Sequence, residues 1–220
     1  MTISDWLSNN WIEIFGAITG IIYVFLEIRQ NIWLWPVGII TSAVYIIVFF
    51  TSKFYADMSL QGYYLAISFA GWYWWVKGGR RWATGDRRQA TGNGDEEEKS
   101  WNSPFEGGKG DVRLIVTRLK LKTGIILSII FVFLYFLLWL ALSKLTDSPV
   151  PEWDSFITSL SIIATWMLAR KIYEHWFLWI VVNTASVIIF ITRGLYPTVI
   201  LYLVYLGMSF AGLKAWRRSL

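Results

Sequence analysis

Tryptophan and amide side chains recur at helical spacing near the end of the sequence. Trp176, Trp179 and Asn183 stand at positions i, i+3 and i+7, which places them on one face of a helix. Tryptophan rings can stack on a flat aromatic solute, and an amide can hydrogen-bond its polar groups. A buried amide without a partner is costly in hydrocarbon, so Asn183 is expected to face protein or a wet cavity.

A second face of this kind is found in the first half of the chain. It consists of Gln61, Tyr64, Ser68 and Trp72 (or Trp75), and Tyr202 begins a corresponding run near the C-terminus. Two other roles remain open for such residues: hydrogen bonding between helices and, for tryptophans near a membrane end, a place in an interfacial aromatic belt. We predict a solute-binding site that consists of Trp35, Gln61, Tyr64, Ser68, Trp72, Trp176, Trp179, Asn183 and Tyr202.

Groups that catalysis or metal binding would need are scarce. The chain has no cysteine and a single histidine, His175, which excludes thiolate sites and a histidine-rich metal centre. We expect His175 to form an interfacial pair with Glu174, and Glu13 and Glu27 to anchor a helix at the membrane interface. We predict no catalytic residue, no metal and no cofactor, and therefore no enzyme.

The central turns of the apolar stretches carry no ionisable residue. Coupling to protons or sodium usually needs a carboxylate or histidine within the membrane, so the sequence favours passive movement of a solute. A phosphorylated solute would need lysine or arginine in these stretches. The predicted solute is therefore uncharged or cationic, and a cationic ring would be attracted to the tryptophan faces.

Seven apolar stretches must position these side chains. Of the 220 residues, 55% are hydrophobic and 16% are charged, a balance that is not typical of a soluble protein. A helix needs about 20 mainly apolar residues to cross a bilayer. The sequence thus predicts an all-α membrane protein with seven transmembrane helices, at residues 9–28, 33–51, 58–77, 123–143, 155–171, 175–192 and 197–215.

The sequence repeats itself at an offset of 141 residues. Residues 35–77 align with residues 176–218 without a gap, and 14 of the 43 aligned pairs are identical. This predicts two parallel three-helix repeats joined by a linker helix, an architecture that places a solute site between the repeats. The predicted units are a first repeat at 1–77, a cytoplasmic loop and interfacial segment at 78–122, the linker helix at 123–143 and a second repeat at 144–220.

Basic residues are distributed unevenly between the two sides of the predicted bundle. Three lie on the side of the N-terminus and 17 on the other side, which predicts an outside N-terminus and a cytoplasmic C-terminus. The net charge of +5 is then explained by topology and anionic lipid, without a nucleic-acid partner. We expect residues 78–109 to form a loosely ordered loop and residues 111–122 a short interfacial helix.

Four segments resemble a known family. They are NIWLWPVGI at 31–39, FYADMSLQGYY at 54–64, GWYWW at 71–75 and WFLWIVVN at 176–183, the last of which fits the motif W-x-x-W-x-x-x-N/D. These segments resemble the PnuC family of bacterial nicotinamide riboside transporters. The resemblance implies a SWEET-like three-one-three fold in a multi-pass protein of the bacterial cytoplasmic membrane.

The resemblance also implies a function. It predicts facilitated diffusion of nicotinamide riboside with alternating access, trapping of the solute by a cytoplasmic riboside kinase, and a homo-oligomer. Nicotinamide riboside is a pyridinium cation with a carboxamide and a ribose, and we expect tryptophans to stack on its ring while Gln61 and Asn183 bind carboxamide or ribose. A related transporter of thiamine or riboflavin is an alternative, as are an intramembrane enzyme and a scaffold that docks a partner through residues 78–122.

Overall fold

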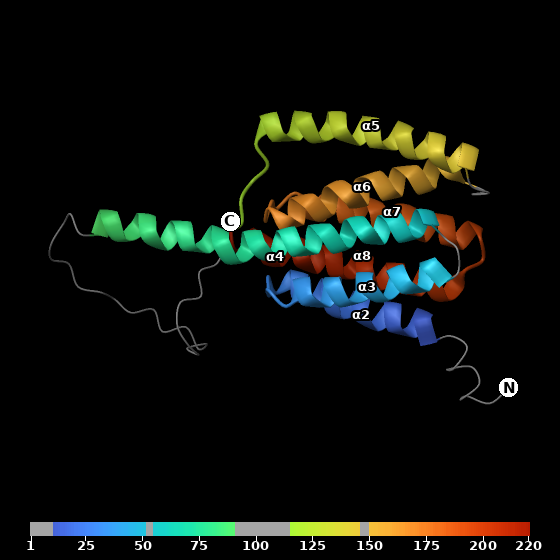
Figure 1. The fold of residues 1–220 in the computed structure, drawn as a ribbon, viewed down its shortest axis with the longest axis horizontal. Coiled ribbons are helices and arrows are strands. Elements are labelled where there is room, and N and C mark those ends of the chain that lie inside the picture. Colours follow the sequence, from blue (N-terminus) through green and yellow to red (C-terminus); the bar gives the residue numbers. More distant parts are fainter. Residues whose placement is uncertain (1–10, 52–54, 91–114, 146–149) are drawn as a thin grey trace.

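A computed structural model of the chain describes residues 11–51, 55–90, 115–145 and 150–220 (Figure 1). The described part is helical, and its helices are α2 (Trp11–Ile28), α3 (Leu34–Thr51), α4 (Tyr55–Ala90), α5 (Leu121–Leu145), α6 (Pro151–Ala169), α7 (His175–Thr192) and α8 (Tyr196–Arg217). The prediction of an all-helical protein with seven helices is confirmed for this part of the chain. Apart from one isolated β-bridge, the described residues contain no strand.

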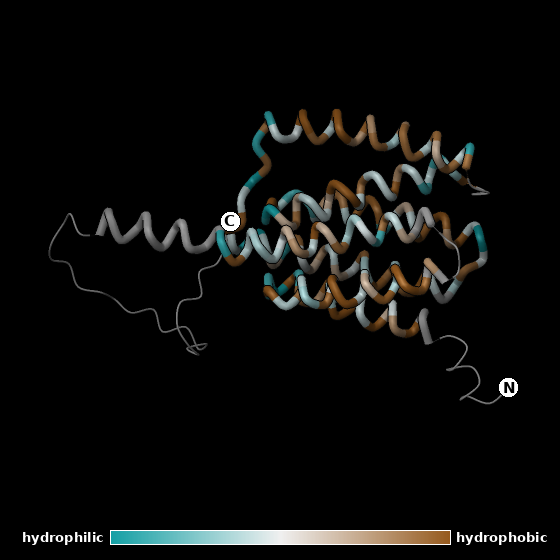
Figure 2. Tube along the Cα trace, in the orientation of Figure 1, coloured by the Kyte–Doolittle hydropathy of each residue, from teal (hydrophilic) through white to brown (hydrophobic). Residues whose placement is uncertain are grey.

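Hydropathy differs among the helices. Three of them, α5, α7 and the Thr198–Arg217 part of α8, are long and apolar enough to cross a membrane, while α2 and α3 contain shorter apolar segments at Ile14–Ile28 and Leu34–Val48. Figure 2 shows hydrophobic residues along most of α5. The helix α6 is less apolar because it carries buried hydroxyl side chains at Ser155, Ser159, Ser161 and Thr165.

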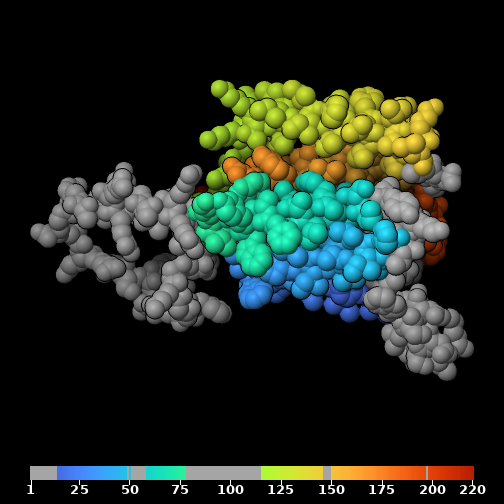
Figure 3. Space-filling model, viewed as in Figure 1, coloured from blue at the N-terminus to red at the C-terminus, as the bar shows by residue number. Residues whose placement is uncertain are grey.

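Six of the helices form a closed ring. Going around it, α2 packs on α3, α3 on α4, α4 on α6, α6 on α7, α7 on α8, and α8 on α2. The remaining helix, α5, packs on α6 and lies outside the ring (Figures 1 and 3). Since sequence neighbours run in opposite directions, α2 ends and α3 and α7 begin at one end of the bundle, the end marked C in Figure 1.

Two segments differ from the expectation. The helix α4 continues to Ala90, although a loop was expected from residue 78, because extending an existing helix costs far less than starting one. A helix was expected at residues 115–120, but the structure has none there. Instead, Thr117 forms a parallel bridge with Ile172 in the α6–α7 turn. Apolar and basic residues that alternate are equally typical of an extended strand, and Val116 is indeed buried beside exposed Thr117. The rest of the predicted loop, 91–114, lies outside the described residues.

Equivalent positions of the sequence repeat have equivalent local structure. Gln30 and Lys171, which are 141 positions apart, both adopt a left-handed backbone, with φ of 52° and 51°. The Trp35 ring contacts the Trp75 ring edge-on at a centroid distance of 5.4 Å, and Trp176 and Trp216 do the same at 5.8 Å. Each member of the first pair is thus matched by a member of the second.

A glycine lets each tryptophan approach the neighbouring helix. A Cβ on Gly212 would overlap the Trp176 ring, and forcing extra atoms into a packed core costs about 1–3 kcal/mol. We therefore expect Gly212→Ala to lower the midpoint of thermal unfolding in detergent. Gly207 in the same helix has nothing within 4 Å of such a Cβ, so Gly207→Ala should leave the midpoint unchanged or raise it. Equal midpoints for the two variants would contradict this role of Gly212.

Candidate functional site

The ring of six helices encloses a cavity of about 430 Å³. Each of the six helices contributes side chains to its wall. The polar groups in the wall are mainly hydroxyls and amides, among them Thr19, Ser42, Gln61, Ser161 and Asn183. Such a wall can hold a solute of moderate size that has both apolar faces and hydrogen-bonding groups.

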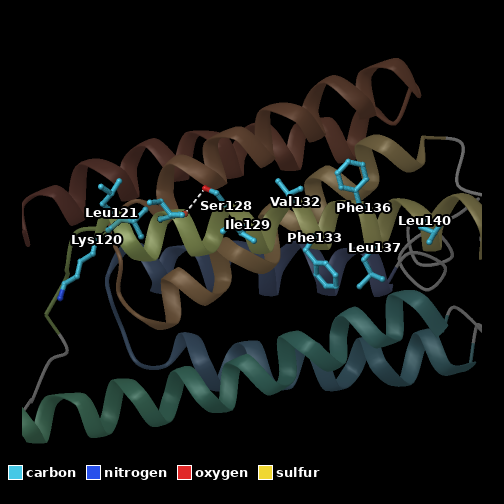
Figure 4. Close-up of a pocket in the computed structure, with 12 residues that line it drawn as sticks. Lys120, Leu121, Ser128, Ile129, Val132, Phe133, Phe136, Leu137 and Leu140 are labelled. Carbon is cyan, nitrogen blue, oxygen red and sulfur yellow. Dashed lines mark hydrogen bonds between the residues drawn. The ribbon is translucent and has the colours of Figure 1, made fainter.

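A larger hollow, of about 1130 Å³, lies along α5 (Figure 4). All of its lining residues come from one stretch of chain, 119–140, and nearly all of them are apolar. Its one hydroxyl, on Ser128, already donates a hydrogen bond to the Gly124 carbonyl oxygen, at 3.0 Å. This groove offers a solute little to bind, and its composition suits lipid chains.

Seven of the nine residues predicted for the site line the enclosed cavity. Three come from α4, three from α7 and one from α8, so the fold brings together residues far apart in the sequence. The seven are Gln61, Tyr64, Ser68, Trp176, Trp179, Asn183 and Tyr202.

The structure does not bring Trp35 and Trp72 to this cavity. Trp35 is fully buried between α3 and α4, where its ring covers Gly71. Trp72 is 39% exposed and lies on the outer surface beside Phe69. The reason is the direction of the inward face of α4, which follows Ser68 and Gly71 and therefore turns the next residue, Trp72, outward.

Hydrogen bonds organise the α7–α8 side of the cavity. The Asn183 amide donates to Ser209 Oγ at 3.0 Å, and this hydroxyl donates to the Tyr205 carbonyl oxygen at 2.8 Å. Part of the Asn183 side chain therefore links two helices, as the alternative role proposed for it requires. Because an amide has two donor hydrogens and an acceptor oxygen, this single bond leaves capacity for a solute.

Two tryptophans present unused donors. The Nε1 atoms of Trp176 and Trp179 are buried and have no hydrogen-bond partner, and both residues line the cavity. Trp35 and Trp75, which do not line the cavity, also have buried Nε1 atoms without a partner, so an unpaired indole donor does not by itself mark a ligand position.

At the end of the bundle marked C, the cavity holds a buried carboxylate–imidazole pair that was not expected. Glu27, at the end of α2, lines the cavity and is only 2% exposed, and its Oε1 lies 3.0 Å from Nε2 of the fully buried His175. The expected His175–Glu174 pair is wrong, since Glu174 Oε2 instead accepts a hydrogen bond from the Leu119 backbone N–H at 2.8 Å. Glu27 was expected to anchor a helix at the interface, and its side chain is instead buried inside the bundle. The side chain of Glu13 lies outside the described residues.

The Glu27–His175 pair also bears on the expectation of passive movement. A carboxylate and a histidine do lie within the bundle, so passive movement can no longer be argued from their absence. One signal could have found Glu27: Thr19, Tyr23 and Glu27 stand four residues apart on α2 and all line the cavity.

The described residues contain no cluster of three or more histidine, cysteine, aspartate or glutamate side chains that could hold a metal ion. What the arrangement offers is a polar, aromatic chamber with one acidic end. It can bind a solute by stacking, hydrogen bonding and charge.

Comparisons with known proteins agree on one family. A family model described as nicotinamide mononucleotide transporter matches residues 10–218. The chain is 28% identical over 219 residues to the nicotinamide riboside transporter PnuC of Escherichia coli (strain K12), covering 96% of this chain and 86% of the relative. It is 24% identical over 206 residues to the riboflavin/roseoflavin transporter RibM of Streptomyces davaonensis, covering 94% and 84%.

A solved structure has the same fold. The crystal structure of the vitamin B3 transporter PnuC superposes with a TM-score of 0.66 at 21% sequence identity, over 96% of this chain and 82% of the other. The chain therefore shares the fold of that protein.

Proposed function

The chain belongs to the nicotinamide mononucleotide transporter family, and we propose that it moves nicotinamide riboside across the bacterial cytoplasmic membrane by facilitated diffusion. The observation that carries the choice of solute is the charge of the cavity wall. Among the described residues that line it, Glu27 is the sole charged side chain, and lysine and arginine are absent. A mononucleotide would bring a phosphate into this wall without a cation to meet it, whereas the riboside is itself a cation.

The lining residues support a division of roles within the site. Trp176 and Trp179 would stack on the pyridinium ring, and their free Nε1 donors would meet acceptor oxygens of the solute. Gln61 and Asn183 would bind the carboxamide or the ribose. Trp35 would act indirectly, by packing α3 against α4 behind the cavity. The remaining wall residues of the proposal are Tyr64, Ser68 and Tyr202.

The proposed architecture is the SWEET-like three-one-three arrangement. Its units are residues 1–77, 78–122, 123–143 and 144–220, which correspond to α2–α4, the connecting segment, α5 and α6–α8. The matched tryptophan pairs and left-handed turns support it, as does the position of α5 outside the ring. Rocking of the two triplets around the cavity would give alternating access.

The remaining parts of the proposal concern the cell. We place the N-terminus outside and the C-terminus in the cytoplasm, on the strength of the basic residues. A cytoplasmic riboside kinase would trap the solute, because the phosphorylated product would not suit a wall without lysine or arginine. We also propose a homo-oligomer, for which α5 offers an apolar face with no buried residue. Since the relatives are named transporters, no chemical step is proposed.

A binding titration tests the choice of solute. Purified protein should bind nicotinamide riboside and bind nicotinamide mononucleotide on the order of a hundredfold more weakly, since burying an unpaired phosphate costs several kcal/mol. Riboflavin and thiamine complete the series, and the similarity to RibM makes riboflavin the second candidate. Tight binding of the mononucleotide, or no binding of the riboside, would contradict the proposal.

A transport assay tests the passive mechanism. In proteoliposomes the riboside should equilibrate across the membrane, and a pH gradient should not change the final internal concentration. The buried Glu27–His175 pair makes this a demanding test, because such a pair could carry a proton. Accumulation driven by the pH gradient would show that transport is coupled; protein-free liposomes are the control.

A further inference from the structure

The cavity wall carries a negative charge at one end. Of the described residues that line the cavity, Glu27 is the one with a formal charge, and its side chain is 2% exposed. It stands at the end of α2, on the same face as Tyr23, so its carboxylate and the aromatic wall belong to one chamber.

Glu27 is held by groups from α7 and α8, its carboxylate by α7 and its backbone by α8. Nε2 of His175 lies 3.0 Å from Glu27 Oε1, and His175 Nδ1 lies 2.7 Å from the Ile172 carbonyl oxygen. The indole Nε1 of Trp216 donates to the Glu27 carbonyl oxygen at 3.0 Å. His175 thus fixes the carboxylate, while Trp216 fixes the backbone that carries it.

A second buried cation near this end is directed elsewhere. Lys171 is 2% exposed, and its Nζ lies 4.2 Å from the centroid of the Trp75 ring and 3.4 Å from Gln30 Oε1. Lys171 is not among the residues that line the cavity. Among the described residues that line the chamber, the charge that a solute meets is therefore that of the Glu27 carboxylate.

The repeat shows that the fold does not need a polar pair here. At the offset of 141 residues, Glu27 corresponds to Leu168 and His175 corresponds to Leu34. Both leucines are fully buried and belong to one apolar cluster. Well-packed apolar residues often replace a buried ion pair without loss of stability, whereas burying charge is costly. Glu27 is therefore a costly buried group, and the equivalent position of the other repeat has an apolar residue instead.

We propose that Glu27 selects a positively charged solute by supplying its counter-charge inside the cavity. The proposal rests on the function proposed above and adds a specificity-determining residue to it. In a site largely shielded from water, attraction between a carboxylate and a pyridinium ring in the same chamber is worth on the order of tenfold in affinity or more. His175 is the positioning residue that holds the carboxylate.

The test compares two forms of one solute. Nicotinamide riboside carries a positive ring, while its reduced 1,4-dihydro form keeps the carboxamide and ribose but is uncharged. Titration of purified wild type, Glu27→Gln and Glu174→Gln should show that wild type and Glu174→Gln prefer the cation. In Glu27→Gln the affinity for the cation should fall on the order of tenfold while that for the neutral form is kept, so the preference shrinks. The reduced ring also stacks differently from the cationic ring. The ratio of the two affinities is therefore compared between variants, because the stacking difference is common to all of them.

Three outcomes would overturn the proposal. The first is an equal affinity of wild type for the two forms. The second is an equal loss of affinity for both forms in Glu27→Gln, which would mean that Glu27 has only a structural role. If Glu27→Gln cannot be purified, the double variant Glu27→Leu with His175→Leu takes its place, since it introduces the leucine pair found in the other repeat. The third outcome that would overturn the proposal is that this double variant keeps the preference for the cation. Wild type that binds neither form would instead contradict the proposed function.

Discussion

Replacing His175 with alanine is expected to destabilise the protein by about 3–5 kcal/mol, because the change leaves a buried carboxylate without its partner. Glu27, which is 2% exposed, would keep a charge without the imidazole that now lies 3.0 Å away. The change would also empty the space between the Trp176 and Trp216 rings, whose centroids lie 4.7 and 4.6 Å from that of His175. The measurement is the midpoint of thermal unfolding in detergent.

The matched control separates charge from packing. The double variant with leucine at positions 27 and 175 removes both polar side chains and refills the space, so it should recover most of the lost stability. Glu174, whose carboxylate accepts a backbone hydrogen bond outside the cavity, serves as the second control, and Glu174→Gln should cost much less than His175→Ala. If His175→Ala unfolds at the wild-type temperature, the pair does not stabilise the bundle.

The helices are predictable because crossing hydrocarbon requires a long uncharged run, which is visible in one sequence. The repeat is visible for a similar reason: Trp35 and Trp176 occupy equivalent places and both pack over a glycine. The end of α4 and the bridge between Thr117 and Ile172 are not visible, because they depend on helix continuation and on a partner distant in the sequence.

Predicted site residues line the cavity only on helices for which the spacing identified the inward face correctly. On α7 the spacing from Trp176 to Asn183 places all three predicted residues in the wall. On α4 both Trp72 and Trp75 fit the spacing after Ser68. The structure leaves Trp72 outside and buries Trp75 against Trp35.

The acidic end of the site was missed for a different reason. Glu27 lies near a helix end, where a charge usually indicates the membrane interface. Its partner, His175, is 148 positions away, and only folding brings the two together. Burial of a charge depends on the tertiary partner, so local sequence does not report it.

Replacing Trp179 with alanine is expected to lower the affinity for nicotinamide riboside by about 2–3 kcal/mol, or roughly 30- to 150-fold. Trp179 lines the cavity, its Nε1 has no partner there, and its repeat equivalent is Gly38, so one ring faces the solute from this level of the wall. Both stacking area and a hydrogen-bond donor would be lost. Isothermal titration of purified protein measures the change.

Two further variants divide this loss. Trp179→Phe keeps an aromatic face but removes the donor, so it should cost only about 1 kcal/mol, the net value of one hydrogen bond. Trp72→Ala is the matched control, because Trp72 shares the predicted spacing yet is 39% exposed outside the cavity, and its affinity should equal that of wild type. A greater loss of affinity in Trp72→Ala than in Trp179→Ala would mean that the solute binds outside the enclosed cavity. Trp72 would then be a site residue, as its spacing predicted, in spite of its exposed position.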